Sequence, residues 1–366
     1  MYARMTGETV TSASLPEPLP PVWRFQVARW ASFDGCAAGL DLTPGELSWF
    51  ADAKGWNRRA AGPIRHYTYR WIPTASGGVR LIERPKPRIA ELQRRILRHV
   101  VDALPVHEAA HGFRRGRSPL SCAAPHAGRE TVVRMDLEGF FPTVSARRIS
   151  ALFALAGYPP AVAEALAGVL TTAVPPDVLA TAPGGRRDPA RVRLLNNLAA
   201  THLPQGAPSS PAVANAVTHH LDRRLDGLAR ALGAVYTRYA DDLAFSGDSL
   251  PLHRLLPGVR RIVTDEGFRL RDDKTSVAAA HQRQRVAGLV VNSAPAATRA
   301  DYDALRALLH NCVHTGPEAQ NRAAHPDFRA HLLGRIGWIG ASSQARAAKL
   351  RALFDGITWA QAGVRS

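Results

Sequence analysis

Two adjacent carboxylates stand out in the sequence, in the segment Tyr239-Ala240-Asp241-Asp242. Apolar residues on both sides predict a β-hairpin with the two acids at its tip. Paired acids suit metal binding, because enzymes that move phosphoryl or nucleotidyl groups use two divalent cations about 3.5–4 Å apart. Hard Mg²⁺ is held by a few carboxylates together with substrate phosphates. An Asp-Asp pair also makes a good turn, so other motifs must decide between the two interpretations.

A third acid from another strand is needed to bridge two cations, and Asp136 is the candidate. It stands near the end of a short apolar segment, 132–137, which predicts a strand interrupted by Arg134. The chain then turns into a helix that Ser145 would cap and Gly157 would end. The pattern therefore predicts a metal site built from three aspartates.

The elements that must position these acids are a mixture of strands and helices. Segments 67–72 and 79–83 predict a second hairpin with its turn at 76–78. The Pro- and Arg-rich segment 174–193 predicts an exposed insertion. Apolar spacing and end signals predict further helices over 44–53, 89–104, 210–232, 302–310, 325–339 and 344–359.

Composition favours a polyanionic partner. The 366 residues include 47 Lys and Arg against 30 Asp and Glu, which gives a net charge of +17. A surface of this sign favours nucleic acid through counterion release. Cys36, Cys122 and Cys312 are too far apart to indicate a disulfide framework or a zinc site. Residues 1–20 do not resemble a signal peptide and no apolar run reaches a membrane span, so we expect a cytoplasmic protein with no membrane partner.

Several companion motifs accompany the paired acids. With them the chain resembles the reverse transcriptase family, and within it the bacterial retron type, from about residue 60 to the end. Asp136-Leu-Glu-Gly-Phe-Phe-Pro is similar to the first catalytic-acid motif, and Tyr239-Ala-Asp-Asp242 to the metal-binding hairpin. Further matches are His111-Gly-Phe113, the substrate-loop motif at 203–211, Lys274 after two aspartates, and the strand at 287–292.

This resemblance implies an α+β fold of the right-hand polymerase kind, with fingers, a palm of antiparallel sheet plus helices, and a helical thumb. Residues 1–60 would form an N-terminal tail and helical extension. Residues 61–295 would form the fingers and palm, and residues 296–366 the thumb.

The resemblance also assigns roles to matching positions. Asp136, Asp241 and Asp242 would be the catalytic residues and would hold two Mg²⁺ ions per active site. Phe141 would lie under the sugar of the incoming nucleotide and exclude a ribose 2′-hydroxyl. The alternative for Phe141, which follows Phe140, is a core phenylalanine in a turn.

Four further residues would bind nucleotide. Gln205 and Gly206 would lie under the templating base pair, where glycine allows a close approach of the backbone. Lys274 and Arg80 would contact the triphosphate, the first as a point charge and the second as a planar fork. For Arg80, a solvated position on the hairpin is the alternative.

Two departures from the retron pattern concern the RNA partner. The type usually carries Asn-Ala-x-x-His and Val-Thr-Gly, both associated with recognition of the cognate RNA. This chain reads Cys122-Ala-Ala-Pro-His126 and Val286-Ala-Gly288, so an amide and a hydroxyl are replaced. We expect RNA contacts from His126, Gly288 and Asn292.

The sequence therefore predicts an RNA-directed DNA polymerase that uses dNTPs to copy a dedicated structured non-coding RNA into DNA. The retron resemblance further implies a start from an RNA 2′-hydroxyl, an RNA-linked DNA product and a role in anti-phage defence, often with an effector protein. One alternative is another bacterial defence or intron-type reverse transcriptase. The other is a non-catalytic RNA-binding scaffold, against which the three aspartates argue.

Overall fold

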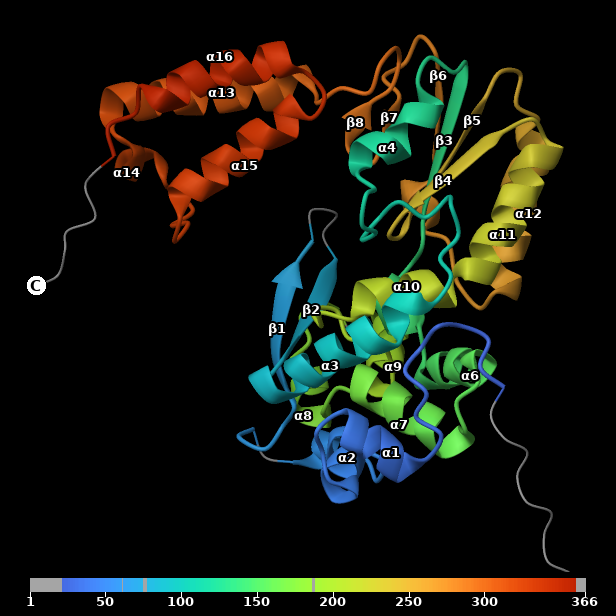
Figure 1. Cartoon of the computed structure of the whole chain (residues 1–366). Coiled ribbons are helices and arrows are strands. Elements are labelled where there is room, and N and C mark those ends of the chain that lie inside the picture. The colour runs from blue at the N-terminus through green and yellow to red at the C-terminus, as the bar shows by residue number, and fades with distance from the viewer. Residues whose placement is uncertain (1–21, 61, 75–77, 186–187, 360–366) are drawn as a thin grey trace, which may run out of the picture.

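The computed structural model describes residues 22–60, 62–74, 78–185 and 188–359. Strands and helices are mixed, and at the centre lies a four-stranded antiparallel sheet in the order β4-β5-β3-β6 (Figure 1). Its strands are β3 (Thr131–Asp136), β4 (Val235–Tyr239), β5 (Asp242–Gly247) and β6 (Ser276–Ala279). The predicted hairpin at the paired acids is confirmed as β4 and β5.

Alternate residues of β3 face two different hydrophobic clusters. Val133 and Met135 pack in a larger cluster, whereas Val132 packs in a smaller one. Successive side chains of a strand point to opposite faces of its sheet, so this single strand joins both cores. The register places Asp136 opposite Asp242.

Different elements cover the two faces of the sheet. The face of Val133 is covered by α11 (His219–Ala231) and α12 (Leu252–Asp265), which pack in the same larger cluster (Figure 1). The face of Val132 is covered by α4 (Pro119–Ala123) together with the short strands β7 (Arg285–Val286) and β8 (Leu289–Val290).

The larger cluster continues into a helical region below the sheet in Figure 1. This region contains α1 (Phe33–Gly39), α2 (Pro44–Phe50), α3 (Pro87–His99), α5 (Phe140–Thr143), α6 (Ala146–Ala156), α7 (Pro160–Leu170) and α10 (Ser210–Val217). The hairpin of β1 (Tyr67–Pro73) and β2 (Val79–Pro85) projects from it, beside α8 (Pro176–Ala180) and α9 (Pro189–Ala199).

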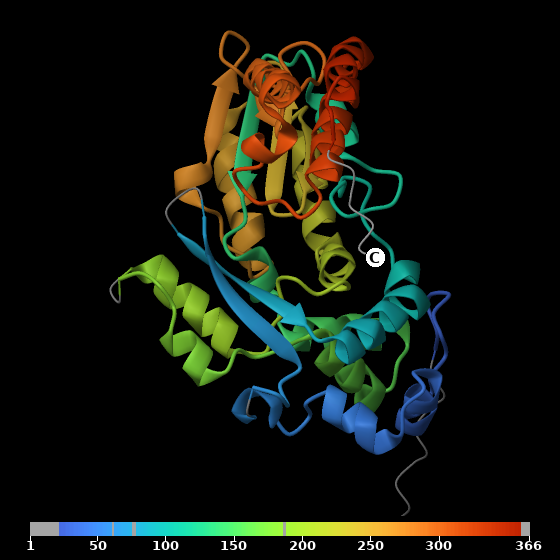
Figure 2. The same ribbon diagram turned by 90° about the vertical axis from the view of Figure 1, so that its left-hand side faces the viewer.

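The C-terminal helices pack mainly on one another. They are α13 (Arg299–Thr315), α14 (Pro317–Gln320), α15 (Phe328–Gly340) and α16 (Gln344–Asp355), and their apolar residues belong to the smaller cluster. Figures 1 and 2 place these helices and the β1–β2 hairpin on the same side of the molecule. Among the described residues, no helix is both long and apolar enough to cross a membrane.

Local side chains cap the starts of α2 and α6. Thr43 and Glu46 form a capping box at the start of α2, with their side chains hydrogen-bonded to each other's backbone amides. Ser145 caps α6, which ends at Gly157. Short 3₁₀ turns lie at Asn57–Arg59, Val101–Ala103, Ala124–His126 and Asp272–Lys274.

The helix predicted over 210–232 is wrong in one respect, because it is divided at Thr218 into α10 and α11. The hydroxyl of Thr218 donates to the carbonyl oxygens of Ala214 and Asn215, at 2.8 and 3.2 Å. Such a bond to the preceding turn competes with the helical ladder and bends the helix.

The exposed insertion predicted over 174–193 is also wrong in part. Helix α8 and the start of α9 form there, and Val174 is buried with Leu81 and Leu198 in a third small cluster. The predicted turn at 76–78 lies mostly outside the described residues.

Candidate active site

Strand register and a tight turn bring the three predicted catalytic aspartates together. Asp136 ends β3 directly opposite Asp242, the first residue of β5. Asp241 precedes it in the turn, and its carbonyl oxygen accepts a hydrogen bond from the Leu137 amide at 2.9 Å. Ala240 has a left-handed φ of 58°, which is typical of tight hairpin turns. The sheet and the turn thus fix the backbone positions from which the three carboxylate side chains extend.

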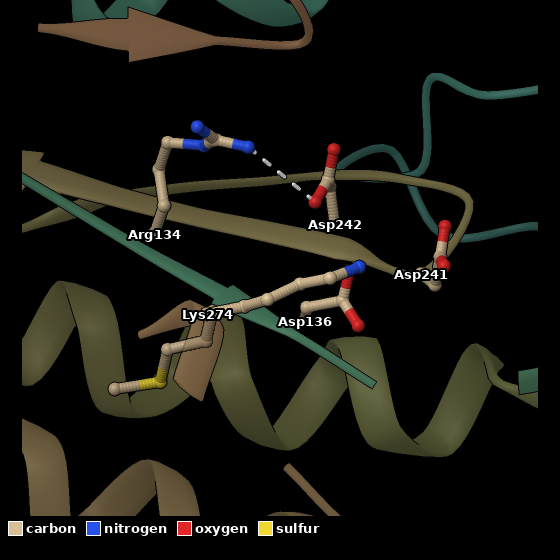
Figure 3. Close-up of a pocket in the computed structure, with 6 residues that line it drawn as sticks. Arg134, Asp136, Asp241, Asp242 and Lys274 are labelled. Atoms are coloured by element: carbon tan, nitrogen blue, oxygen red, sulfur yellow. Dashed lines mark hydrogen bonds and ion pairs between the residues drawn. The ribbon is translucent and has the colours of Figure 1, made fainter. Parts of the chain in front are cut away.

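The three carboxylates face a shared cavity of about 350 Å³, whose remaining lining comes from Arg134, Met135 and Lys274 (Figure 3). The Lys274 Nζ lies 2.8 Å from Asp136 Oδ2. A guanidinium nitrogen of Arg134 lies 3.6 Å from Asp242 Oδ1. The prediction for this site missed Arg134, although its charge inside an apolar strand was a signal.

Burial and mutual repulsion act on the acids of this cavity. Desolvation, with the charges of Asp136 and Asp242, raises the pKa of Asp241 to about 6. Burial also raises the pKa of Asp242, although Arg134 opposes the shift. Both raised pKa values mean that the site disfavours its own negative charge and gains stability from added positive charge.

The donor set fits a hard divalent cation, since all three acids offer carboxylate oxygen. In the described parts of the chain, no three His, Cys, Asp or Glu side chains are already gathered as a metal cluster. The ammonium of Lys274 lies against Asp136 instead, and stands where positive charge is favoured. The cavity therefore has the chemistry for Mg²⁺, with Lys274 as its present counter-charge.

The other predicted nucleotide-binding residues lie outside the lining of this cavity. Gln205 and Gly206 are held against β2, where the Glu83 amide donates to Gln205 O at 2.9 Å. Gly206 has a φ of 134°, and a Cβ there would lie 3.0 Å from Glu83 O, so the position requires glycine. Arg80 is exposed on the same strand.

Phe141 belongs to a group of aromatic rings next to the turn that carries Asp241 and Asp242. Its ring centroid lies 5.4 Å from that of Phe140 and 6.3 Å from that of Phe113. Phe113 in turn lies 6.3 Å from Tyr239. Phe140 is buried, whereas Phe141 is only partly buried, so Phe141 keeps a surface that a nucleotide could meet.

A buried ion pair under the 203–211 loop was missed by the sequence analysis. Glu83 and His202 are 0% and 1% exposed, and His202 Nε2 lies 3.1 Å from both carboxylate oxygens. Burial lowers the pKa of His202, but the charge and hydrogen bond of Glu83 outweigh it and leave the pKa raised. Glu83 also accepts the Gln205 amide at 3.1 Å, so this pair anchors the loop.

The prediction that His126 contacts RNA is wrong, because its side chain is completely buried. Its two ring nitrogens lie 2.7 Å from the hydroxyls of Thr237 and Ser246, on β4 and β5. Burial lowers the pKa of His126 to about 4, so the ring is neutral. Cys122 lies beside it, with Sγ 3.2 Å from the Thr237 hydroxyl. His126 therefore connects α4 and its following turn to the sheet.

Gly288 and Asn292 are exposed, as an RNA contact requires. Gly288 lies in the β7–β8 turn, where a Cβ would come 3.7 Å from the ring of Trp338 on α15. The Asn292 amide group donates to Ala280 O and Gln282 O, at 2.9 and 2.7 Å. The backbone turn at Gly288 is thus free to meet a partner, whereas Asn292 also holds the neighbouring loop.

Comparison with known proteins agrees with this geometry. Residues 72–291 match the family described as reverse transcriptase (RNA-dependent DNA polymerase), and this segment contains all three aspartates. The match covers more than half of the chain.

Curated relatives extend the match toward both ends. The retron Mx65 reverse transcriptase of Myxococcus xanthus is 38% identical over 89% of this chain and 72% of its own length. The retron Mx162 reverse transcriptase of the same organism is 40% identical over 76% of this chain and 58% of its own length. The retron Ec86 reverse transcriptase of Escherichia coli is 31% identical over 64% of this chain and 65% of its own length. The chain belongs to the reverse transcriptase family of RNA-dependent DNA polymerases, and within that family to the retron type.

Proposed function

We propose that the chain copies a dedicated structured non-coding RNA into DNA by two-metal nucleotidyl transfer, with Asp136, Asp241 and Asp242 as catalytic residues. The main support is that one acid from β3 and two from the β4–β5 turn face a single cavity. Two Mg²⁺ ions are the proposed cofactors, because carboxylates alone supply the protein's oxygen ligands there.

Each protein group has a proposed task. When bound, Mg²⁺ would lower the pKa of the primer hydroxyl and stabilise the charge on the leaving pyrophosphate. Asp136 and Asp242 hold negative charge on paired strands and Asp241 holds it in the tight turn beside them, so little reorganisation would be needed at the moment of reaction. Lys274, now 2.8 Å from Asp136, would contact the triphosphate of the incoming dNTP.

The right-hand arrangement is the finer fold proposal. The four-stranded sheet with α11 and α12 would be the palm, and the β1–β2 hairpin with α3 would belong to the fingers, both within residues 61–295. Residues 296–366 would be the thumb, since α13–α16 have their own apolar contacts. Residues 1–60 would be the N-terminal extension.

The remaining nucleotide contacts are proposed from position. Phe141 would exclude the ribose 2′-hydroxyl, and its partly exposed ring near Tyr239 supports this role. Gln205 and Gly206 would lie under the templating pair, supported by the close approach of Gly206 to β2. Arg80 would reach the triphosphate from the exposed side of the hairpin.

The RNA partner is proposed to meet the β7–β8 turn at Gly288 and the adjoining Asn292, with His126 fixing the sheet from within. The relatives' names support the retron type. For this chain we propose a start from an RNA 2′-hydroxyl, an RNA-linked DNA product, and anti-phage defence with an effector protein. The chain would act in the cytoplasm, where its RNA template and dNTPs are found.

The test is Mg²⁺-dependent dNTP incorporation on an RNA template. Asp241→Asn should abolish it and leave the fold intact, because an amide cannot supply the charge that holds the cations. Asp136→Asn should behave in the same way. Asp303→Asn, on the surface of α13, is the matched control and should extend normally. Near-normal extension by Asp241→Asn would overturn the assignment, and RNA binding without extension by the wild type would favour a scaffold.

A further inference from the structure

A fully buried ion pair lies behind the catalytic turn. Arg238 on β4 and Asp222 on α11 are both 0% exposed, and two guanidinium nitrogens meet the two carboxylate oxygens at 2.7 Å each. Arg238 is opposite Leu243 in the sheet, one residue away from the Tyr239–Asp242 pair. Because side chains alternate along a strand, Arg238 points to the face opposite the acidic cavity.

The third guanidinium nitrogen of Arg238 reaches the turn itself. It donates to the carbonyl oxygen of Ala240 at 3.0 Å, and to Asn215 Oδ1 at 3.1 Å. Ala240 is the residue with φ of 58° that directly precedes the two aspartates. A guanidinium is planar and holds its donors in a fixed fork, so the anchor at Asp222 sets where the Ala240 carbonyl lies.

Asn215 extends the same network to a second turn. Its side chain, 2% exposed, donates from Nδ2 to the carbonyl oxygen of Gly112 at 2.8 Å. Gly112 lies flat against the catalytic turn, since a Cβ there would be 2.6 Å from the Ala240 nitrogen. The backbone of Arg238 supports this segment as well, by accepting the His111 amide at 2.8 Å.

Phe113 directly follows Gly112, and this second turn holds its aromatic ring at the surface. Its φ is 59°, which is uncommon for a residue other than glycine, and its side chain is 51% exposed. A strained backbone persists only where the surroundings hold it, and here they hold an exposed ring beside Phe141 and Tyr239.

We propose that Asp222, Arg238 and Asn215 form a positioning unit that fixes, from inside the protein, the turn carrying Asp241 and Asp242 and the turn carrying Phe113. The proposal rests on the proposed function, because it takes the two aspartates as catalytic. A buried ion pair is weak evidence for a role in stability alone. Here Arg238 and Asn215 bond to each other and to the backbone carbonyls of Ala240 and Gly112, which favours a role in geometry. Asp222 anchors Arg238 and also accepts the Tyr236 hydroxyl at 2.8 Å.

Single-turnover extension of a DNA primer on an RNA template, with the full chain and saturating dTTP, tests the proposal. The amplitude reports the fraction of competent enzyme, and the rate constant reports nucleotide addition. Arg238→Lys keeps a positive charge for Asp222 but cannot also reach Ala240 with a fixed fork. Its rate constant should fall about 100-fold with the amplitude retained, because a displacement of about 1 Å has such an effect.

A second variant and a control keep the outcome clear. Asn215→Ala removes the bonds to Arg238 and Gly112 and should lower the same rate constant, and it decides the matter if Arg238→Lys does not fold. Phe153→Leu, buried on α6 in the region below the sheet, should lower the melting temperature and leave the rate constant unchanged.

The opposite pattern would overturn the positioning role. If the network only supports stability, Arg238→Lys and Asn215→Ala should lower the amplitude while each competent molecule keeps the wild-type rate constant. Asp241→Asn is measured alongside: normal extension by that variant means that the proposed function has failed. Loss of extension by Asp241→Asn with a wild-type rate constant in Arg238→Lys and Asn215→Ala rejects the positioning unit alone.

Discussion

Two buried ion pairs support two loops of the candidate active site, and they differ in kind. Arg238 and Asp222 lie behind the turn that carries Asp241 and Asp242, whereas Glu83 and His202 lie under the 203–211 loop. Both pairs are almost fully buried, and both also bind backbone of the loop they support. Arginine keeps its charge at every pH in ordinary use, but histidine can lose a proton near neutrality.

Because each loop has its own ion pair, we expect that a change in one pair can increase the mobility of its loop without affecting the other. The turn that carries Asp241 and Asp242 is held by a pair whose arginine stays charged at every pH in ordinary use. The 203–211 loop is held by a pair whose attraction depends on the protonation of His202. Four measurements, from the largest expected change in stability to the smallest, can sharpen this contrast or break it.

Asp222→Ala should have the largest effect, a loss of about 3–5 kcal/mol in the free energy of unfolding, because it leaves the Arg238 charge buried without a partner. Urea unfolding measures it. The control is Asp303→Ala, which removes a partner of the exposed Arg299 and should cost about 0–1 kcal/mol. Equal losses in the two variants would mean that the buried pair matters no more for stability than an exposed one.

Glu83→Gln should have the next largest effect, a loss of about 1–3 kcal/mol, because its neutral amide cannot satisfy both His202 and the Gln205 amide. The 203–211 loop should loosen, so the KM for dNTP should rise more than kcat falls. Steady-state extension at several dNTP concentrations measures the split. A fall in kcat alone would mean that the loop does not support nucleotide binding.

The pH dependence should separate the two pairs. Because the pKa of His202 is raised in the folded protein, the stability that its charge contributes is fully present below its ordinary pKa of 6.5. That stability is lost as pH rises through the raised folded pKa. The unfolding penalty of Glu83→Gln should therefore shrink as pH rises above about 6.5, while the penalty of Asp222→Ala changes less over the same range. Parallel curves for the two variants would remove the distinction.

Phe141→Ala should change stability least, because its side chain is partly exposed and supports neither pair. Its expected effect is on selectivity: more ribonucleotide incorporated relative to deoxyribonucleotide, since the space for a 2′-hydroxyl opens. Competitive extension with both nucleotide types measures the ratio. An unchanged ratio would identify Phe141 as a core residue of the turn.

Much of this arrangement could be predicted because it depends on residues that are close together in the sequence. The hairpin at the paired acids and the strand ending at Asp136 follow from alternation and turn residues. The comparisons confirm the family and the retron type that the motifs predicted. The burial of His126 contradicts its predicted RNA contact, and the roles of the other site residues remain predictions.

The parts that could not be predicted depend on residues far apart in the chain. The sequence near each residue does not predict the pairing of Asp222 with Arg238 or of Glu83 with His202. Taken alone, each of these charged side chains would be expected on the surface. His126 illustrates the same limit: its burial follows from hydroxyls on two strands more than 100 residues away. The pairing of Lys274 with Asp136 likewise appears only once the sheet has formed.

The alternating burial of β3 restricts insertions and deletions more than substitutions. A change of one residue in length within this strand would exchange the faces of all later side chains. Met135 would leave the larger cluster, and Asp136 would turn away from Asp242. Single replacements of similar polarity disturb only one contact. An insertion or deletion within this strand should therefore disturb the fold more than most single replacements in it, because it moves every later side chain to the wrong face.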